Sequence, residues 1–229
     1  MTRYVAPLLA VLSLAFVSVT QAATQFVEGK HYTRIQSPRP TSVPAGKVEV
    51  MEVFSYGCPA CDRFVPVIKR IQSSLPPNAQ MVFLPASFNP REAWPMFQRA
   101  YITAQMLGVA DKNHEAVYQS VWQNGELAIS DPTSHQIKTK LPTIEDAAKF
   151  YNKRSGVPVD KFISTAKSFA VDVKVKAADD LVRAYQVDST PTLIVNGKWK
   201  LNNQSIESID QIVELVKFLV AKESAPATS

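Results

Sequence analysis

The sequence is poor in cysteine, with only two cysteines among its 229 residues. They are Cys58 and Cys61, which excludes a framework of several disulfides such as small secreted domains use. A bridge between them would close a very short loop, and stabilisation by a disulfide grows with loop length. The pair therefore predicts redox chemistry through a reversible Cys58–Cys61 disulfide rather than a structural cross-link.

Histidine is also scarce, with three residues, His31, His114 and His135. Two thiolates at the spacing of Cys58 and Cys61 are common in tetrahedral zinc sites, so half of a zinc site is the alternative interpretation of the pair. The sequence has no second cysteine pair to complete it, and no two histidines stand at ligand spacing. We therefore predict neither a metal site nor another cofactor.

Blocks of like charge are absent. The formal net charge is +5, and Lys and Arg are scattered without a run of five cationic residues, so we expect no nucleic-acid partner. With 46% hydrophobic and 20% charged residues, the composition is that of a globular protein and not of a disordered one. We expect a monomer.

One long apolar run is present, and it lies near the N-terminus. Arg3 precedes the nearly uncharged stretch Val5 to Val19, and small residues follow up to Ala22. The run is short for a membrane span, which needs about 20 apolar residues. We predict a secretory signal peptide at residues 1–22 and a periplasmic location, with an uncleaved N-terminal anchor as the alternative.

The first half of the remaining chain predicts a strand, a helix and a second strand. Residues 47–54 are rich in β-branched and apolar side chains, which is typical of a strand buried on both faces. Pro59 suits the first turn of a helix, whereas Pro66 lies further inside and is expected to kink it. Residues 80–84 read as the second strand, so the three elements form a parallel crossover unit.

The middle of the chain predicts helices and the end predicts strands again. Apolar residues recur at helical spacing in the stretches 94–107, 113–123, 143–154 and 160–169 and from Val171 to Tyr185. A strand at Thr192 to Val195, an Asn196-Gly197 hairpin turn, a partner strand from Lys198 and a helix capped by Ser208 and Gln211 follow.

The expected position of Cys58 favours its thiolate. At the start of a helix, unpaired N–H groups and the positive end of the helix dipole stabilise an anion. A lowered thiol pKa stabilises the reduced dithiol form, which makes the disulfide a better oxidant. We therefore predict an exposed, reactive Cys58 and, one turn further, a buried resolving Cys61.

Glu52 stands on the same pleat face as Val50 and Phe54, in a strand that is otherwise apolar and ends just before Cys58. Burying a carboxylate is costly. Glu52 could exchange a proton with the buried thiol, or its charge could disfavour a nearby thiolate. An acid at an open sheet edge is the alternative.

Pro191 follows Thr190 at the entry to a predicted strand. A proline in this position can follow a cis bond, which would present the preceding main chain to a neighbour. An ordinary trans loop proline is the alternative, and these residues alone favour it.

Taken together, these motifs resemble the DsbA family of bacterial periplasmic disulfide oxidases. The resemblance rests on Glu52-Val-Phe-Ser-Tyr-Gly-Cys58-Pro-Ala-Cys61, the long helical stretch and Thr190-Pro191-Thr-Leu-Ile-Val-Asn-Gly, and it covers residues 26–220. It implies an α/β thioredoxin fold formed by residues 23–87 and 187–229, with an inserted all-helical domain at 88–186.

The resemblance also implies site residues and partners. Cys58 is the nucleophile, Cys61 its partner, Glu52 the buried acid, and Pro191 a cis-proline facing the pair. Thr190 and the dipeptide Pro59-Ala60 are expected to contact substrate, which is a reduced exported protein with free cysteines. A quinone-linked membrane partner of the DsbB kind would reoxidise the protein.

Two residues depart from the family pattern. Ala60 stands where histidine is the best-known residue, which affects the expected oxidising strength, and Thr190 stands where valine is familiar, which affects substrate preference. The function predicted is the introduction of disulfides into exported proteins. A periplasmic disulfide reductase or isomerase is the alternative, and a non-enzymatic peptide-binding holdase is a further one.

Overall fold

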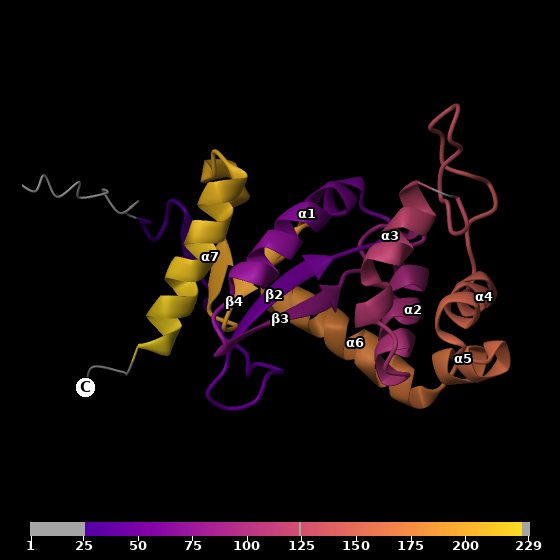
Figure 1. Ribbon diagram of the computed structural model, residues 1–229, viewed down its shortest axis with the longest axis horizontal. Helices are drawn as coiled ribbons and strands as arrows, with labels where there is room; N and C mark the ends of the chain where they lie inside the picture. Colours follow the sequence, from indigo (N-terminus) through magenta and orange to yellow (C-terminus); the bar gives the residue numbers. More distant parts are fainter. Residues whose placement is uncertain (1–25, 124, 226–229) are drawn as a thin grey trace, which may run out of the picture.

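The structure is a computed structural model that describes residues 26–123 and 125–225 (Figure 1). Within them, five strands form one sheet in the order β1-β5-β4-β2-β3. The strands are β1 (Tyr32–Arg34), β2 (Val48–Phe54), β3 (Ala79–Pro85), β4 (Thr192–Val195) and β5 (Trp199–Leu201). Strands β2 and β3 are parallel and the other pairs antiparallel. The predicted signal peptide lies outside the described residues.

Strand β2 confirms the prediction of a strand buried on both faces. All seven of its residues are buried, because β3 and β4 flank it and helices cover both faces of the sheet. The expectation that Glu52 is its single acidic exception was wrong. Glu49 is fully buried as well, with an exposed fraction of 0%.

Helix α1 (Pro59–Ser74) connects β2 to β3 and covers one face of the sheet together with α7 (Ile209–Ser224). Pro59 occupies the first turn, and Pro66 lies inside the helix, which continues to Ser74. The buried stripe of α1 packs with α7 and with one side of β2 and β4 in a single apolar cluster. The helix expected after Cys58 is confirmed.

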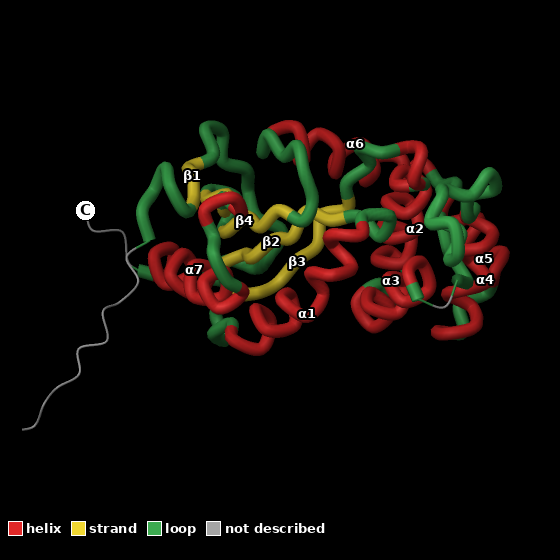
Figure 2. Tube along the Cα trace, turned by 90° about the horizontal axis from the view of Figure 1, so that it is seen from above, coloured by secondary structure: helices red, strands yellow, loops and turns green. Residues whose placement is uncertain are grey.

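The helical stretch forms α2 (Trp94–Met106), α3 (His114–Trp122), α4 (Ile144–Ser155), α5 (Val159–Ala166) and α6 (Phe169–Ala184). Figure 1 shows α2 to α5 gathered beyond one end of the sheet, and Figure 2 shows α6 on the side of the sheet opposite α1. The helix predicted over 160–169 ends earlier, at Ala166, because Ser168 accepts a hydrogen bond from Val171 N and caps a new helix.

On the face of the sheet opposite α1, one buried core joins the sheet to the helices. Side chains of β2 and β4 pack in one buried cluster with residues from α2 to α6. The helical segment is therefore bound to the sheet by a continuous apolar interior. None of the helices within 26–123 and 125–225 has both the length and the apolar character needed to cross a membrane.

The hairpin of β4 and β5 confirms the Asn-Gly turn. Asn196 and Gly197 have φ angles of 53° and 63°, the left-handed values that this two-residue turn requires. A side chain at Gly197 would approach the carbonyl oxygen of Arg39 to 2.5 Å. Strand β1, only three residues long, was not predicted.

Candidate active site

The two cysteines lie where β2 passes into α1. After Phe54 the chain turns through Ser55, and Cys58 N donates to Ser55 O at 3.1 Å. Cys58 has extended backbone angles and precedes the first helical residue, Pro59. The predicted place of Cys58 at the start of the helix is therefore confirmed.

Gly57 is required by close packing in this turn. A Cβ atom there would lie 2.6 Å from the carbonyl oxygen of Glu92 and 2.6 Å from the ring of Trp94. Real Cβ atoms do not approach other atoms so closely, so any larger residue would push the turn away from the start of α2. The helical segment therefore fixes the position of the residue before Cys58.

The expectation of an exposed Cys58 thiol was wrong. The residue is only 6% exposed, compared with 1% for Cys61. The cause is the loop before β4, which lies against the helix start: Cys58 Sγ is 3.5 Å from the main-chain oxygen of Thr190. Both cysteines are free thiols, so the structure represents the reduced form.

The two thiols differ in their electrostatics. A hydrogen bond from the Cys61 side chain is the largest effect that lowers the pKa of Cys58, from 9.0 to about 6. Partial burial opposes this shift, while Thr190 and the N–H groups of Cys61 and Ala60 add to it. Burial, followed by the hydrogen bond to Cys58, raises the pKa of Cys61.

Glu52 lies in the middle of the sheet, opposite Leu193 of β4 and Phe83 of β3. It is 2% exposed, and burial, with a smaller contribution from the charge of Cys58, raises its pKa well above 4.5. The charge of Glu52 is also among the causes that raise the pKa of Cys61. Burial therefore favours the protonated carboxyl group, and Glu52 lies close enough to interact electrostatically with both sulfurs.

The loop before β4 brings Thr190 and Pro191 to the cysteines. The bond between them is cis, as the resemblance implied. The Thr190 hydroxyl is buried and has no hydrogen-bond partner among the described residues, which leaves it free to donate to a sulfur anion. Asn203 Nδ2 donates to Pro191 O at 2.9 Å and ties this loop to the segment before α7.

A shallow groove of about 330 Å³ begins beside Ala60. Phe64 of α1 lines one side and Ile206, Ile209 and Ile212 line the other. Pro59, the residue before Ala60, is exposed. Sequence reasoning named Pro59 and Ala60 but missed the isoleucines, which are separated from them by about 150 positions of chain.

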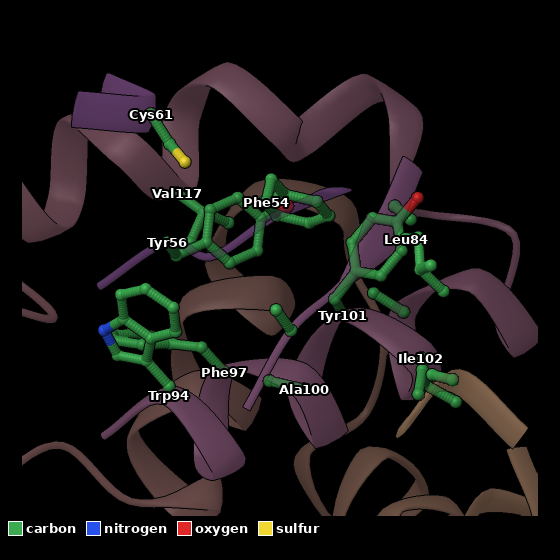
Figure 3. Close-up of a cluster of buried hydrophobic side chains, with 14 of the residues drawn as sticks. Phe54, Tyr56, Cys61, Leu84, Trp94, Phe97, Ala100, Tyr101, Ile102 and Val117 are labelled. Atoms are coloured by element: carbon green, nitrogen blue, oxygen red, sulfur yellow. The ribbon is translucent and has the colours of Figure 1, made fainter. Parts of the chain in front are cut away.

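The aromatic cluster under the active-site turn was also missed. Trp122 Nε1 of α3 donates to Tyr56 O at 2.9 Å, and the Tyr56 hydroxyl lies 2.9 Å from Nδ1 of His114. Figure 3 shows Cys61 at the edge of this cluster, above Tyr56 and Phe54. Burial lowers the pKa of His114 to about 3, so this histidine is a neutral part of the interior.

The second buried acid, Glu49, has a different environment. Its Oε2 accepts hydrogen bonds from Ser42 N at 2.7 Å and from Ser42 Oγ at 2.6 Å. Because successive residues of a strand alternate between faces, Glu49 points away from the face that holds Glu52. No group of three or more His, Cys, Asp or Glu side chains that could hold a metal occurs in the part of the chain that the structure describes.

Comparison with known proteins gives one consistent result. The Thioredoxin family model matches residues 43–215. The thiol:disulfide interchange protein DsbA of Pseudomonas aeruginosa is 34% identical over 96% of this chain and 97% of its own length. That of Pseudomonas syringae is also 34% identical, over 90% of this chain and 89% of its own length.

Solved structures agree. A crystal structure of a variant of the Pseudomonas aeruginosa protein superimposes with a TM-score of 0.74 at 34% identity, covering 87% of this chain and 98% of that one. DsbA from Xylella fastidiosa gives a TM-score of 0.74 at 28% identity, covering 86% and 97%. This chain belongs to the DsbA family.

Family membership confirms the thioredoxin fold with a helical insertion and the class of activity. The protein is a DsbA-type thiol-disulfide oxidoreductase that introduces disulfide bonds. The domain limits 23–87, 88–186 and 187–229 remain predictions, as do the roles of the individual site residues and the Cys58–Cys61 disulfide of the oxidised form.

Proposed function

We propose that Cys58 is the sulfur that exchanges with client proteins and that Cys61 completes the exchange. The observation that supports this most directly is the lowered pKa of Cys58, about 6, beside the raised pKa of Cys61. A thiol that ionises easily is a good leaving group, and its stabilised anion favours the reduced form. The disulfide of such a pair therefore tends to pass to other proteins.

The reaction begins with the oxidised protein. A client thiolate attacks Cys58 Sγ, the Cys58–Cys61 bond breaks, and a mixed disulfide forms between the client and Cys58. The Cys61 sulfur leaves as a thiolate and takes a proton, for which the carboxyl group of Glu52, with its raised pKa, is the nearby donor. A second client thiolate then attacks the client sulfur of the mixed disulfide and releases Cys58 as a thiolate.

Two electrons thus move from the client to the cysteine pair, and the client gains one disulfide. The Thr190 hydroxyl and the N–H groups of Ala60 and Cys61 stabilise the released Cys58 anion. The Thr190 main chain and the Pro191 loop, which lie against the sulfur, would align the client chain by main-chain hydrogen bonds. Pro59, Ala60 and the adjoining groove would contact the client side chains.

The clients are reduced, exported proteins with free cysteines, and the location is the periplasm, reached through the signal peptide predicted at 1–22. A membrane protein of the DsbB kind, which passes electrons to a quinone, would reoxidise the dithiol. No observation among the described residues favours the reductase, isomerase or holdase alternatives over the oxidase.

The reduction potential in a glutathione redox buffer tests this proposal. We expect a value more oxidising than about −200 mV, the approximate poise of an oxidising secretory compartment. A value near the −270 mV typical of a reductase such as thioredoxin would instead support the reductase alternative. In a second assay, the oxidised protein, added in an amount equal to that of a small dithiol peptide, should oxidise the peptide.

A further inference from the structure

Strand β3 leaves one edge of the sheet unpaired. Its hydrogen-bonded neighbour is β2, and within the described residues no strand lies on its other side. Residues 79–83 are partly or fully exposed, whereas the neighbouring strand β2 is buried throughout. Figures 1 and 2 both show this edge at the border of the sheet, between α1 and α6.

The free edge presents the main chain of Met81 and Phe83. Ala86 N donates to Phe54 O at 2.7 Å and Val48 N donates to Asn78 O at 2.8 Å, so the even-numbered residues of this segment face β2. The odd-numbered residues must then face outward. Pro85 confirms the alternation, because its outward oxygen accepts a hydrogen bond from Gln98 Nε2.

The outward N–H and C=O groups of Met81 and Phe83 have no such partner: no hydrogen bond to them is formed by any residue in 26–123 or 125–225. Unpaired edge groups of this kind are a template for another extended chain. Proteins usually protect such edges with charges, prolines or a covering element. Here the edge lines a cavity, and Lys69 and Lys174 lie beside it without pairing with its main chain.

The cavity has a volume of about 760 Å³. Val65 and Ile68 of α1 line one side together with the polar Lys69 and Gln72. Ala177 and Leu181 of α6 line the other side together with Lys174. Tyr101 of α2 closes one end. The cavity is separate from the groove beside Ala60, because the two lie against different residues of α1.

The shape and the free main-chain groups specify the occupant. Alternating N–H and C=O groups between the two helices complement an extended peptide whose side chains point alternately to α1 and to α6. A folded second copy does not fit, because its own β3 is flanked by the same two helices and cannot enter a recess of this volume. A single unfolded segment can.

We infer that the β3 edge is a second binding site, which adds an extended segment of an unfolded polypeptide as a further strand between α1 and α6. The segment need not contain cysteine, since the site lies along the sheet edge and not at the sulfurs. The inference that this polypeptide is a client rests on the proposed function. The site would hold a client by its main chain while its cysteines react elsewhere on the protein.

The test uses the reduced, isotopically labelled protein and a cysteine-free nine-residue peptide of alternating valine and threonine with a lysine at each end. We expect chemical-shift changes and slowed hydrogen exchange at the Met81 and Phe83 amides. Changes centred on Ala60 and Ile206 instead, or no binding at millimolar peptide, would overturn the inference.

Two variants separate main-chain pairing from side-chain effects. Met81→Pro removes an outward N–H without disturbing the bonds to β2, since proline is tolerated at a strand edge, and Met81→Leu is its matched control. We expect the peptide to bind about three- to tenfold more weakly to Met81→Pro, as the loss of one hydrogen bond predicts, and with unchanged affinity to Met81→Leu. Equal weakening in both variants would overturn strand addition.

A third variant, Ala177→Trp, fills the recess from an exposed position of α6. We expect it to abolish peptide binding and to slow the oxidation of a reduced, unfolded protein several-fold, with oxidation of a small dithiol peptide unchanged. Unchanged peptide binding would overturn the inference. Failure of the unmodified protein to oxidise the small dithiol would overturn the proposed function and leave the peptide-binding result unaffected.

Discussion

The surroundings of Cys58 and of Cys61 differ although the two residues lie within one turn of the same helix. Around Cys58 there are donors: the Cys61 thiol, Thr190 and N–H groups at the start of α1, which together lower its pKa to about 6. Around Cys61 there are apolar side chains and a buried acid, which raise its pKa. Position along the helix alone does not create this difference.

The hydrogen bond between the two cysteines is the largest local cause, and distant parts of the chain add to the difference. Thr190 comes from the loop before β4, more than 130 positions after Cys58, and Glu52 comes from the middle of β2. The helical segment adds Trp122, which fixes the Tyr56 main chain. A single cysteine pair thus acquires one sulfur suited to leave and one suited to remain protonated.

Replacing each cysteine in turn should show the difference between Cys58 and Cys61 most strongly. We expect Cys58→Ser to reduce dithiol oxidation to the rate without enzyme, because no exchangeable sulfur remains at the helix start. Cys61→Ser cannot form the internal disulfide, but its Cys58 thiolate should attack the disulfide of an oxidised client and expel one client thiolate. The mixed disulfide should then accumulate, because no second cysteine remains to displace the client. Non-reducing gels with mass spectrometry would show the adducts, and adducts formed equally by both variants would contradict the assignment.

Replacing the buried acid Glu52 should alter the behaviour of Cys61. Burial raises the pKa of Glu52 in the folded protein above its value in the unfolded chain. At low pH the carboxyl group is protonated in both states and costs no stability, but the folded protein loses stability as the pH rises through the raised pKa. We therefore expect Glu52→Gln to equal the unmodified protein in stability at pH 4 and to exceed it at pH 8. It should also change the pH profile of thiol exchange between pH 5 and 8.

Glu49→Gln is the matched control, because Glu49 is equally buried in the same strand but points to the other face and binds Ser42. We expect it to leave the exchange profile unchanged. Denaturant unfolding at each pH and stopped-flow oxidation of a model dithiol measure the two effects. Identical exchange profiles for both variants and the unmodified protein would assign Glu52 a structural role only.

We expect Thr190→Val to have a smaller effect, on the pKa of Cys58. It removes a hydroxyl that lowers the pKa of Cys58, and a hydrogen bond of ordinary strength corresponds to a rise of about 0.5 to 1 pH unit. Thr192→Val is the control, because its hydroxyl donates to Ser189 O and not to the sulfur. Thiolate absorbance followed against pH measures both, and equal shifts would contradict the role of Thr190.

The sequence predicted those features that depend on neighbours along the chain. The apolar run of β2, Pro59 before the helix stripe, and Asn196-Gly197 are local patterns, and each occurs in the structure as expected. The resemblance added the cis bond at Pro191, which local residues alone did not favour. Strand β1 is too short to produce a pattern.

What the sequence did not predict depends on tertiary contacts. The burial of Cys58 results from the Thr190 loop, and the burial of Glu49 depends on Ser42, whose partner no spacing rule identifies. The groove beside Ala60 combines α1 with residues near 206–212, and the open β3 edge appears only once the strand order is known. The active-site residues were thus identifiable, but their surroundings were not.

Alkylation of the reduced protein as a function of pH, read by mass spectrometry at each cysteine, tests the central difference most directly. Because the pKa of Cys58 is about 6, its modification rate should rise through pH 6 and level off by about pH 7 to 8, as the thiolate fraction does. Cys61, with a raised pKa and 1% exposure, should stay unmodified over the same range. Equal modification of the two cysteines, or no modification of Cys58 below pH 8, would contradict the account.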